Sequence, residues 1–258
     1  MKKKTLLAAL GLFALMIVAC SSGGDNTKEG GSPTLRIATE GTYAPFSYHD
    51  ESGELTGYDV EVAKAVAEKI GYEAQFVEAP WDAMLAAFDA NQADVVFNQV
   101  GITSERQEKY LFSDPYSYSH MVLVTNKDNN SIKGLDDLNG KNAAQSLTSN
   151  FAGVATEHGA NLVSVNGFSQ AVDLLRNGQA DVTLNDDVAF LDYLKQQPDA
   201  PLKIVATAKE GVASAAMIHQ SDTELHVKIN EALSALRADG TLAGISEKFF
   251  GKDISSDS

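Results

Sequence analysis

The sequence predicts an α/β fold built from two similar units. Short apolar runs rich in β-branched residues alternate with amphipathic helical patterns, which is typical of a mostly parallel sheet. The tetrapeptide QADV that begins at Gln92 recurs at Gln179, 87 residues later. Each copy follows a helical pattern and leads into an apolar strand that ends on an asparagine, Asn98 or Asn185. Because the copies share this context, we expect two α/β units that present their strand ends to each other.

The N-terminal segment is interpreted as a leader followed by a tether. Three lysines precede a 14-residue apolar run, Leu6 to Ala19, which is too short to span a bilayer. The run ends in IVAC, which resembles a lipobox, so residues 1–19 are predicted to be a lipoprotein signal peptide and Cys20 the lipid-attachment site. The alternative is an ordinary signal peptide with a stray cysteine. Residues 20–32 are rich in Gly and Ser and are predicted to form a flexible tether.

The first half of the remaining chain is predicted to alternate strands and helices. One expected helix carries Val62, Val66 and Ile70 on a single face and ends at Gly71, while Pro80 precedes the next helix. The expected strands are residues 35–39, 74–77 and 94–97, and the expected helices are residues 59–70 and 81–90, with a short polar helix that begins near Thr103 or Ser104.

The second half continues this alternation and suggests two chain crossings. The expected strands are residues 121–125, 162–165, 182–185, 202–206 and 213–218, and the expected helices are residues 134–140, 151–158, 169–177, 188–197, 223–238 and 242–250. The strands at 121–125 and 213–218 are expected to carry the chain between domains. The predicted division is domain 1 at residues 33–124 and 221–252, domain 2 at residues 125–220, and a C-terminal tail at residues 253–258.

A cation and an anion follow the two copies of the tetrapeptide. Arg106 is expected in the first turn of a short helix, where the helix dipole disfavours a cation, so we expect a carboxylate partner for it. A guanidinium fork beside free backbone N–H groups can bind a small anion. The alternative is a surface arginine paired with Glu105 or Glu108. Asp186 follows the second copy, and a cation facing an anion across a cleft suits a zwitterion.

Composition argues against several other functions. The formal net charge is −15, and removal of the leader takes away three lysines and no acidic residue, giving −18. This acidity disfavours binding to nucleic acid or anionic lipid. The chain has no GxSxG, P-loop or HExxH motif, Cys20 is its only cysteine, and its five histidines lack metal-ligand spacing. We therefore expect no catalytic residues, no metal and no cofactor.

Five sequence motifs are distinctive. They are GTYAPFSY (Gly41–Tyr48), LTGYDVEVAKAVAEKIG (Leu55–Gly71), Trp81-Asp82, NQVGITSERQEKYLFSDPY (Asn98–Tyr116) and DGTLAGISEKFFG (Asp239–Gly251). Together they resemble a known family, the extracellular solute-binding proteins of polar amino-acid ABC importers (family 3). The similarity runs from Leu35 to Gly251, and the motif wording NQVGIT, EGTYAPF and QSLTSN is most similar to the cystine-binding branch. The resemblance implies a two-domain periplasmic-binding-protein-like α/β fold with a ligand cleft between the domains and a two-strand hinge.

The resemblance also implies how the α-groups of an amino acid are held. Arg106 is expected to bind the α-carboxylate through both arms of its guanidinium. Ser149 and Asn150, at the start of a helix in domain 2, are expected to add donors to the same group. Asp186 is expected to bind the α-ammonium together with the backbone carbonyl of Gln99.

The same resemblance assigns the walls of the distal pocket. Tyr43 and Trp81 are expected to sandwich the ligand's side chain, although a core or domain-edge anchor is the alternative for Trp81. Glu40 occupies a position where binders of basic amino acids also carry an acid, and a solvent-facing loop carboxylate is its alternative. Gly101 departs from many relatives, which carry Ser or Thr there, so only its backbone N–H is expected to contact a ligand.

These features predict a binding protein that captures an extracellular amino acid and delivers it to an ABC permease. L-cystine is the predicted ligand, with Arg, Lys, His or Gln as alternatives. The protein is expected to be a monomer, anchored through its N-terminal lipid at the outer face of the cytoplasmic membrane. A ligand-sensing subunit and a lyase on the same fold are the other functions considered.

Overall fold

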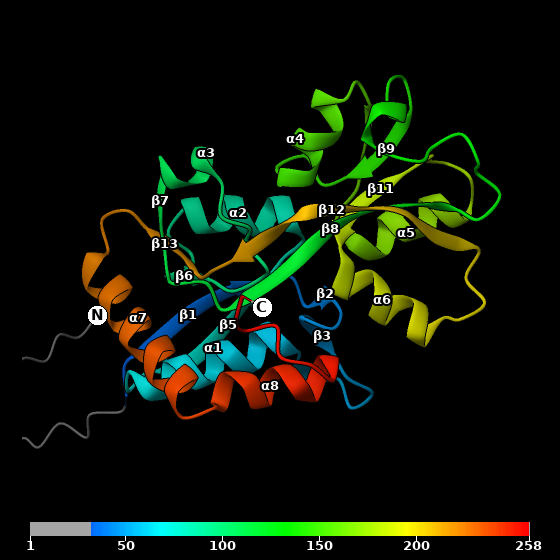
Figure 1. Cartoon of the computed structure of the whole chain (residues 1–258). Helices are drawn as coiled ribbons and strands as arrows, with labels where there is room; N and C mark the ends of the chain where they lie inside the picture. Colours follow the sequence, from blue (N-terminus) through cyan, green and yellow to red (C-terminus); the bar gives the residue numbers. More distant parts are fainter. Residues whose placement is uncertain (1–31, 258) are drawn as a thin grey trace, which may run out of the picture. The chain divides into compact units, whose positions relative to one another are not determined.

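The computed structural model describes residues 32–257 (Figure 1). The predicted leader and Cys20 lie outside the described residues. No helix within residues 32–257 is long and apolar enough to cross a membrane. The strands are β1 (Thr34–Thr39), β2 (Thr42–Tyr43), β3 (Ser47–His49), β4 (Leu55–Thr56), β5 (Glu73–Glu78), β6 (Val95–Val96), β7 (Tyr110–Phe112), β8 (Ser117–Asn126), β9 (Asn142–Gln145), β10 (Asn161–Ser164), β11 (Thr183–Asp186), β12 (Leu202–Ser214) and β13 (Met217–His219). The helices are α1 (Tyr58–Lys69), α2 (Trp81–Asp89), α3 (Ser104–Gln107), the 3₁₀-helix η1 (Leu135–Asp137), α4 (Asn150–Glu157), α5 (Phe168–Arg176), α6 (Asp187–Gln196), α7 (Thr223–Ala238) and α8 (Thr241–Phe250).

A five-stranded sheet in the order β5-β1-β6-β13-β7 forms the centre of what we call lobe 1, residues 33–116 and 215–257. Its strands carry apolar side chains on both faces because helices cover both. Ile37 and Val95 face a core shared with α1 and α7, whereas Ala38 and Val96 face a second core with α2. This alternation follows from the two-residue period of a strand.

Only part of this sheet is parallel. β1 runs parallel to β5 and β6, but β13 pairs antiparallel with both β6 and β7. Four strands, β5, β1, β6 and β7, thus run in the same direction, as a mostly parallel sheet requires, and β13 is the exception among them. The chain reaches β13 from the long strand β12 after only two residues, Ala215 and Ala216, and so no helix intervenes to make a parallel crossover.

Helix α1 shows how local sequence sets an element of lobe 1. Val62 and Val66 are fully buried on the predicted face, and Asp59 and Glu61 lie in the first turn, where the helix dipole favours acidic groups. The helix ends before Gly71, whose φ of +79° suits glycine. The expected start and stop of this helix agree with the structure to within one residue.

Lobe 2, residues 127–201, is built on shorter strands. β9 and β10 run parallel, and an isolated bridge between Ala143 and Val182 connects β9 to the segment that enters β11. Helices α4, α5 and α6 pack on these strands. Val182 and Leu184 lie in the core of this lobe together with Phe151 from α4.

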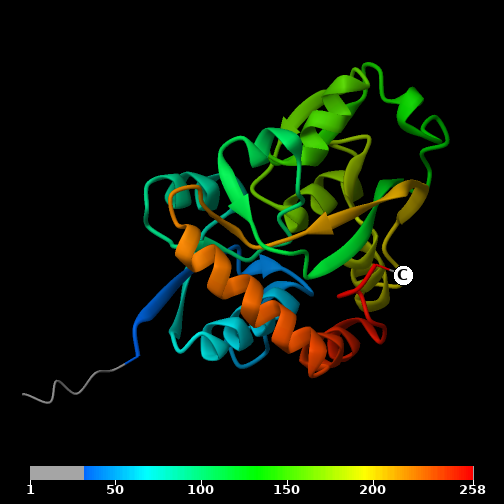
Figure 2. The same cartoon turned by 60° about the vertical axis from the view of Figure 1, so that its left-hand side comes forward.

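Two long strands join the lobes. β8 and β12 pair antiparallel from Ser117 opposite Ser214 to Asn126 opposite Leu202, and they lie side by side in Figures 1 and 2. The sequence predicts separate strands at 202–206 and 213–218, but β12 is continuous to Ser214. Pairing with β8 holds the polar stretch near Gly211 in the strand, with register shifts where the periodicity fails.

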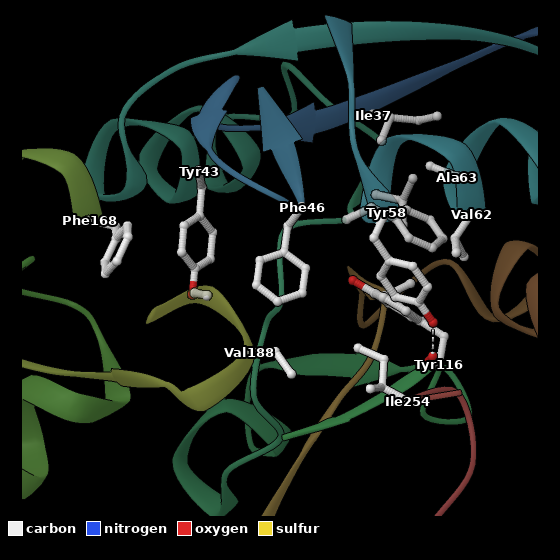
Figure 3. Close-up of a cluster of buried hydrophobic side chains, with 14 of the residues drawn as sticks. Ile37, Tyr43, Phe46, Tyr58, Val62, Ala63, Tyr116, Phe168, Val188 and Ile254 are labelled. Carbon is white, nitrogen blue, oxygen red and sulfur yellow. Dashed lines mark hydrogen bonds between the residues drawn. The ribbon is translucent and has the colours of Figure 1, made fainter. Parts of the chain in front are cut away.

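An aromatic cluster lies under the start of β8 (Figure 3). Phe46, Tyr58 and Tyr116 are fully buried, and the hydroxyl of Tyr58 donates to the carbonyl oxygen of Tyr116 at 2.5 Å. Ile254, from the predicted C-terminal tail, packs into the same core, and its carbonyl oxygen accepts from the backbone N–H of Tyr118. The tail therefore anchors the beginning of a strand that joins the lobes.

Candidate functional site

A pocket lies between the strand ends of lobe 1 and the helix starts of lobe 2. It has about 500 Å³ of empty space, a figure that includes its opening to solvent. Seven of the nine predicted ligand-binding residues line it: Glu40, Tyr43, Trp81, Gln99, Ser149, Asn150 and Asp186. The other lining residues are Ala144, Gln145, Ser146, Phe151, Val165, Gly167, Phe168, Ala171, Thr183 and Asn185.

Asp186, at the end of β11, is buried and accepts hydrogen bonds from residues of β2 and β8. The hydroxyl of Tyr43 donates to Asp186 Oδ2 at 3.0 Å and to Asn185 Oδ1 at 2.6 Å, and Ser119 Oγ donates to Asp186 Oδ1 at 2.6 Å. Burial nevertheless raises the pKa of Asp186 to about 6. A cation entering the pocket would stabilise the ionised carboxylate.

Glu40 follows β1 and is only 7% exposed, so the alternative of a solvent-facing carboxylate is wrong. Asn98 Nδ2 donates to Glu40 Oε2 at 2.7 Å, and the backbone N–H of Glu40 donates to Asn98 Oδ1 at 2.8 Å. Glu40 Oε1 is buried without a hydrogen-bond partner among the described residues. Burial raises the pKa of Glu40 to about 7. The pocket thus contains a carboxylate oxygen whose partner is missing.

Gln99 adopts an unusual backbone conformation, with a φ of +48°. Its side chain is fully engaged away from the ligand space: Nε2 donates to Asp59 Oδ1 at 2.8 Å, and Oε1 accepts from Ser117 Oγ at 2.7 Å. These contacts tie the pocket wall to α1 and to the start of β8. The backbone of Gln99 is therefore the part that can contact a ligand, as the resemblance implies.

Arg106 lies beside the pocket, behind Trp81. Its N–H groups donate to the carbonyl oxygens of Gly101 (2.8 Å) and Thr148 (3.1 Å), and its guanidinium carbon lies 5.4 Å from the centroid of the Trp81 ring. Arg106 and Gly101 do not line the pocket itself, but a Cβ on Gly101 would lie 3.5 Å from Asn150 Nδ2.

The charge of Arg106 has no counter-ion within residues 32–257. The expectation of a carboxylate partner is wrong, and so is the alternative of a surface pair with Glu105 or Glu108, because no ion pair involves this guanidinium. Burial lowers the pKa of Arg106 to about 10. A desolvated cation bonded only to carbonyl oxygens is a strong receptor for an incoming anion.

The start of α4 supplies donors on the lobe 2 side. Ser149 is the N-cap, and its Oγ accepts from the backbone N–H of Phe151 at 3.1 Å. Ser149 therefore caps this helix. Asn150 is the first helical residue. Both residues lie on the pocket wall.

The lobes also contact each other outside the pocket, through residues that the sequence patterns did not indicate. Asp82 Oδ2 accepts from the backbone N–H of Leu147 at 3.1 Å, while Asp82 Oδ1 accepts from the N–H (2.9 Å) and the hydroxyl (2.6 Å) of Thr148. Asp82 and Thr148 both belong to the family motifs, but their spacing in the sequence does not indicate that they meet.

Ser119, which donates to Asp186, is another residue that the sequence analysis missed. A partial signal for it is its alternation with Ser117 on one face of a strand.

Among residues 32–257, no group of three or more His, Cys, Asp or Glu side chains could hold a metal ion. Charged groups of both signs lie in or beside the pocket. Arg106 offers the cationic end of the site, and Asp186 and Glu40 offer the anionic end.

The sequence is similar to proteins of a known family. The chain matches the bacterial extracellular solute-binding proteins, family 3, over residues 35–252. It is 41% identical over 267 residues to the L-cystine-binding protein TcyA of Bacillus subtilis (strain 168), an alignment that covers 98% of this chain and 99% of that protein.

Two solved structures bear on the conformation. The L-cystine solute receptor of Neisseria gonorrhoeae in its unliganded open conformation is 49% identical to this chain. The alignment covers 88% of this chain and 96% of the receptor, and the TM-score is 0.57. An ancestral arginine-binding protein bound to arginine is 37% identical; the alignment covers 86% of this chain and 100% of that protein, and the TM-score is 0.80. The more similar sequence thus has the less similar shape. Together with the Tyr43–Asp186 and Asp82–Thr148 contacts, this difference indicates a closed arrangement of the lobes.

Proposed function

Because the chain belongs to the bacterial extracellular solute-binding proteins of family 3 and has a periplasmic-binding-protein-like fold, we propose that it captures extracellular L-cystine and delivers it to an ABC permease. The observation that carries this proposal is the guanidinium of Arg106, which has no carboxylate partner within the described chain and lies beside a pocket that contains two carboxylates, Asp186 and Glu40. Charges of both signs around one pocket match the two charged groups of an amino acid.

The α-groups of the ligand are bound by both lobes in this proposal. Arg106 binds the α-carboxylate, with Ser149 and Asn150 as further donors from lobe 2. Asp186 binds the α-ammonium together with the backbone carbonyl of Gln99. A ligand that contacts both lobes binds the closed state more tightly than the open state and so shifts the population towards closure. The two predicted domains close about β8 and β12, the strands that join them.

Cystine is preferred over other amino acids for two reasons. Relatives named for L-cystine binding are 41% and 49% identical to this chain. In addition, the unpartnered Glu40 Oε1 can accept from a distal ammonium, and the aromatic rings of Tyr43 and Trp81 suit a disulfide through sulfur–aromatic contacts. Arginine and lysine also carry a distal cation, and the similarity to an ancestral arginine-binding protein keeps arginine as the second candidate.

The cellular arrangement completes the proposal. The protein acts outside the cytoplasmic membrane as a monomer, held there by a lipid on Cys20 and by the tether at residues 20–32. The acidic surface keeps it soluble and away from anionic lipid. Two rival functions, a ligand-sensing subunit and a lyase on the same fold, differ in what happens to the bound amino acid.

Calorimetric titration of the chain from residue 21 onward tests the proposal. The chain is titrated with cystine and each common amino acid, and the ligand is recovered afterwards and analysed. Tightest binding of cystine, with recovery of the unchanged ligand, is the expected result. Tightest binding of glutamine or another neutral amino acid would contradict the cystine assignment, and chemical conversion of the ligand would favour the lyase. A cell lacking the protein should lose cystine uptake, whereas normal uptake would favour sensing.

A further inference from the structure

Gly167 and Glu40 approach each other across the pocket more closely than any side chain at position 167 would allow. A Cβ built on Gly167 would lie 2.7 Å from Glu40 Oε1, a separation that forces one of the two to move. Both residues line the pocket, Gly167 from the start of α5 and Glu40 from the end of β1. The close approach therefore occurs at the pocket wall and involves both lobes.

The backbone of Gly167 does not explain why glycine occupies this position. Its φ of 165° and ψ of −173° describe an extended conformation that any residue adopts. Gly167 is also the N-cap of α5 and provides no side-chain cap, although Ser, Thr, Asp or Asn would satisfy one of the free N–H groups there. The local requirements of the helix thus favour another residue, and the space beside Glu40 is what requires glycine.

The carboxylate of Glu40 cannot easily move away. Asn98 Nδ2 donates to Oε2, Asn98 Oδ1 also accepts from the backbone N–H of Glu40 and so fixes the residue beside it, and the side chain is almost fully buried. Oε1, the oxygen nearest to Gly167, is the one without a partner among the described residues. A side chain at position 167 would displace this oxygen and strain the bond between Oε2 and Asn98.

We propose that Gly167 is a specificity-determining residue: by lacking a side chain it leaves room for the Glu40 carboxylate at the pocket wall, so that Oε1 can pair with a distal cation and amino acids that carry one bind in preference to neutral ones. The inference rests on the proposed function, because it presumes that the pocket binds an amino acid. A buried acceptor without a partner destabilises the protein until a donor reaches it, and a distal ammonium or guanidinium provides a charge-assisted donor. A neutral side chain pairs with this oxygen less favourably.

Substitution of Gly167 with a direct readout of ligand preference tests this role. Gly167→Ala adds one methyl group beside Glu40, and Gly167→Ser adds a side chain that can cap α5 and so preserve stability. We expect each variant to weaken binding of cystine and arginine by about tenfold or more, and binding of glutamine by less than about threefold. Gly153→Ala is the matched control, because Gly153 is also in lobe 2 and a Cβ added there would meet no atom within 4 Å. Its affinities should equal those of the wild type.

A double-mutant cycle with Glu40→Gln separates this role from a general effect on closure. If Gly167 acts through Glu40, the double variant should bind arginine no more weakly than Glu40→Gln alone. Equal losses for arginine and glutamine, additive losses in the cycle, or wild-type affinities in both Gly167 variants would overturn the inference. Wild-type protein that binds only neutral amino acids would also overturn it, while leaving amino-acid capture intact. Wild-type protein that binds no amino acid would instead refute the proposed function.

Discussion

Asp82 and Thr148 are joined by two hydrogen bonds across the lobes, from the backbone N–H and from the hydroxyl of Thr148 to Asp82 Oδ1. Asp82 does not line the pocket, so this contact connects the lobes without touching the ligand space. The same loop also accepts a hydrogen bond from Arg106 at the carbonyl oxygen of Thr148. The loop at 147–148 is therefore held by a carboxylate and a guanidinium of lobe 1 at once.

Asp82→Ala should favour the open state. Loss of three hydrogen bonds to a carboxylate at a solvent-accessible site should weaken binding of every ligand by about 3- to 30-fold, because closure becomes less favourable. Small-angle scattering should show a larger radius of gyration for the ligand-free variant. Glu247→Ala, at an exposed acid in α8, is the control. Unchanged dimensions and affinities would show that this contact does not contribute to closure.

Arg106→Lys should bind all amino acids poorly. The planar guanidinium of Arg106 donates to two carbonyl oxygens and still has N–H groups for a ligand carboxylate. The compact ammonium of lysine cannot make both sets of contacts. We expect losses on the order of 30- to 1,000-fold, measured by calorimetry, with similar losses for cystine and glutamine. Arg176→Lys, at an exposed residue in lobe 2, should bind like the wild type. Near-normal affinity of the Arg106 variant would exclude its proposed role.

Affinity for ligands with a distal cation should rise with pH. Burial is the largest effect on Glu40 and raises its pKa to about 7; the hydrogen bond from Asn98 and the nearby backbone N–H of Trp81 oppose this shift, and the charge of Asp82 adds to it. A bound cation favours the ionised form, so arginine affinity should increase between pH 5 and pH 7 by up to about tenfold per pH unit. Calorimetry across this range gives the dependence.

Glutamine provides the control for this pH dependence. Glutamine has no distal cation, and its α-ammonium pairs with Asp186, whose pKa is about 6. The affinity for glutamine should therefore rise with pH only up to about pH 6. Glu40→Gln should make the arginine profile resemble the glutamine profile. An arginine affinity that does not change between pH 6 and pH 7 in the wild type would contradict the pairing of Glu40 with a distal cation.

Asp59→Asn should stabilise the ligand-free protein at pH 8. Burial raises the pKa of Asp59 to about 7 from an ordinary 3.8, so the folded state binds more protons than the unfolded state between these values. The contribution of this group to stability is full below about pH 4 and is lost as pH rises through about 7. Asn keeps an oxygen to accept from Gln99 and carries no charge.

Urea unfolding at pH 5 and pH 8 measures this effect. Asp59→Asn should increase the free energy of unfolding, relative to the wild type, by a few kcal/mol more at pH 8 than at pH 5. Asp136→Asn, at an exposed position in η1, should shift neither value. A wild-type-like pH dependence in Asp59→Asn would show that Asp59 is ionised in the folded protein.

Cys20→Ser should release the protein from membranes. A lipid on Cys20 is the proposed anchor, and the mature chain carries a net charge of −18 that opposes binding to anionic lipid. Fractionation of cells should find the variant in the soluble fraction, with the ligand affinity of the purified protein unchanged. Retention in the membrane fraction would contradict the lipobox interpretation.

Local patterns in the sequence determined much of the secondary structure, and the family motifs supplied most of the candidate residues. The period of 3.6 residues in α1 and α7 and the apolar runs at β1 and β5 depend only on neighbours along the chain, and their predicted positions agree closely with the structure. The motifs identified seven residues that line one pocket, because a family motif records the outcome of a fold that local physics alone does not reveal.

The tertiary structure decided which groups meet. Tyr43 and Asp186 are 143 positions apart, and their hydrogen bond exists only because β8 and β12 bring the lobes together. The same holds for Glu40 beside Gly167 and for Asp82 bonded to Thr148. The missing counter-ion of Arg106 also follows from the fold, since nearby Glu105 and Glu108 are in reach along the chain but do not pair with it. Burial and pairing depend on surroundings from distant segments, so the pKa of a carboxylate and the need for glycine at position 167 cannot be predicted from sequence periodicity.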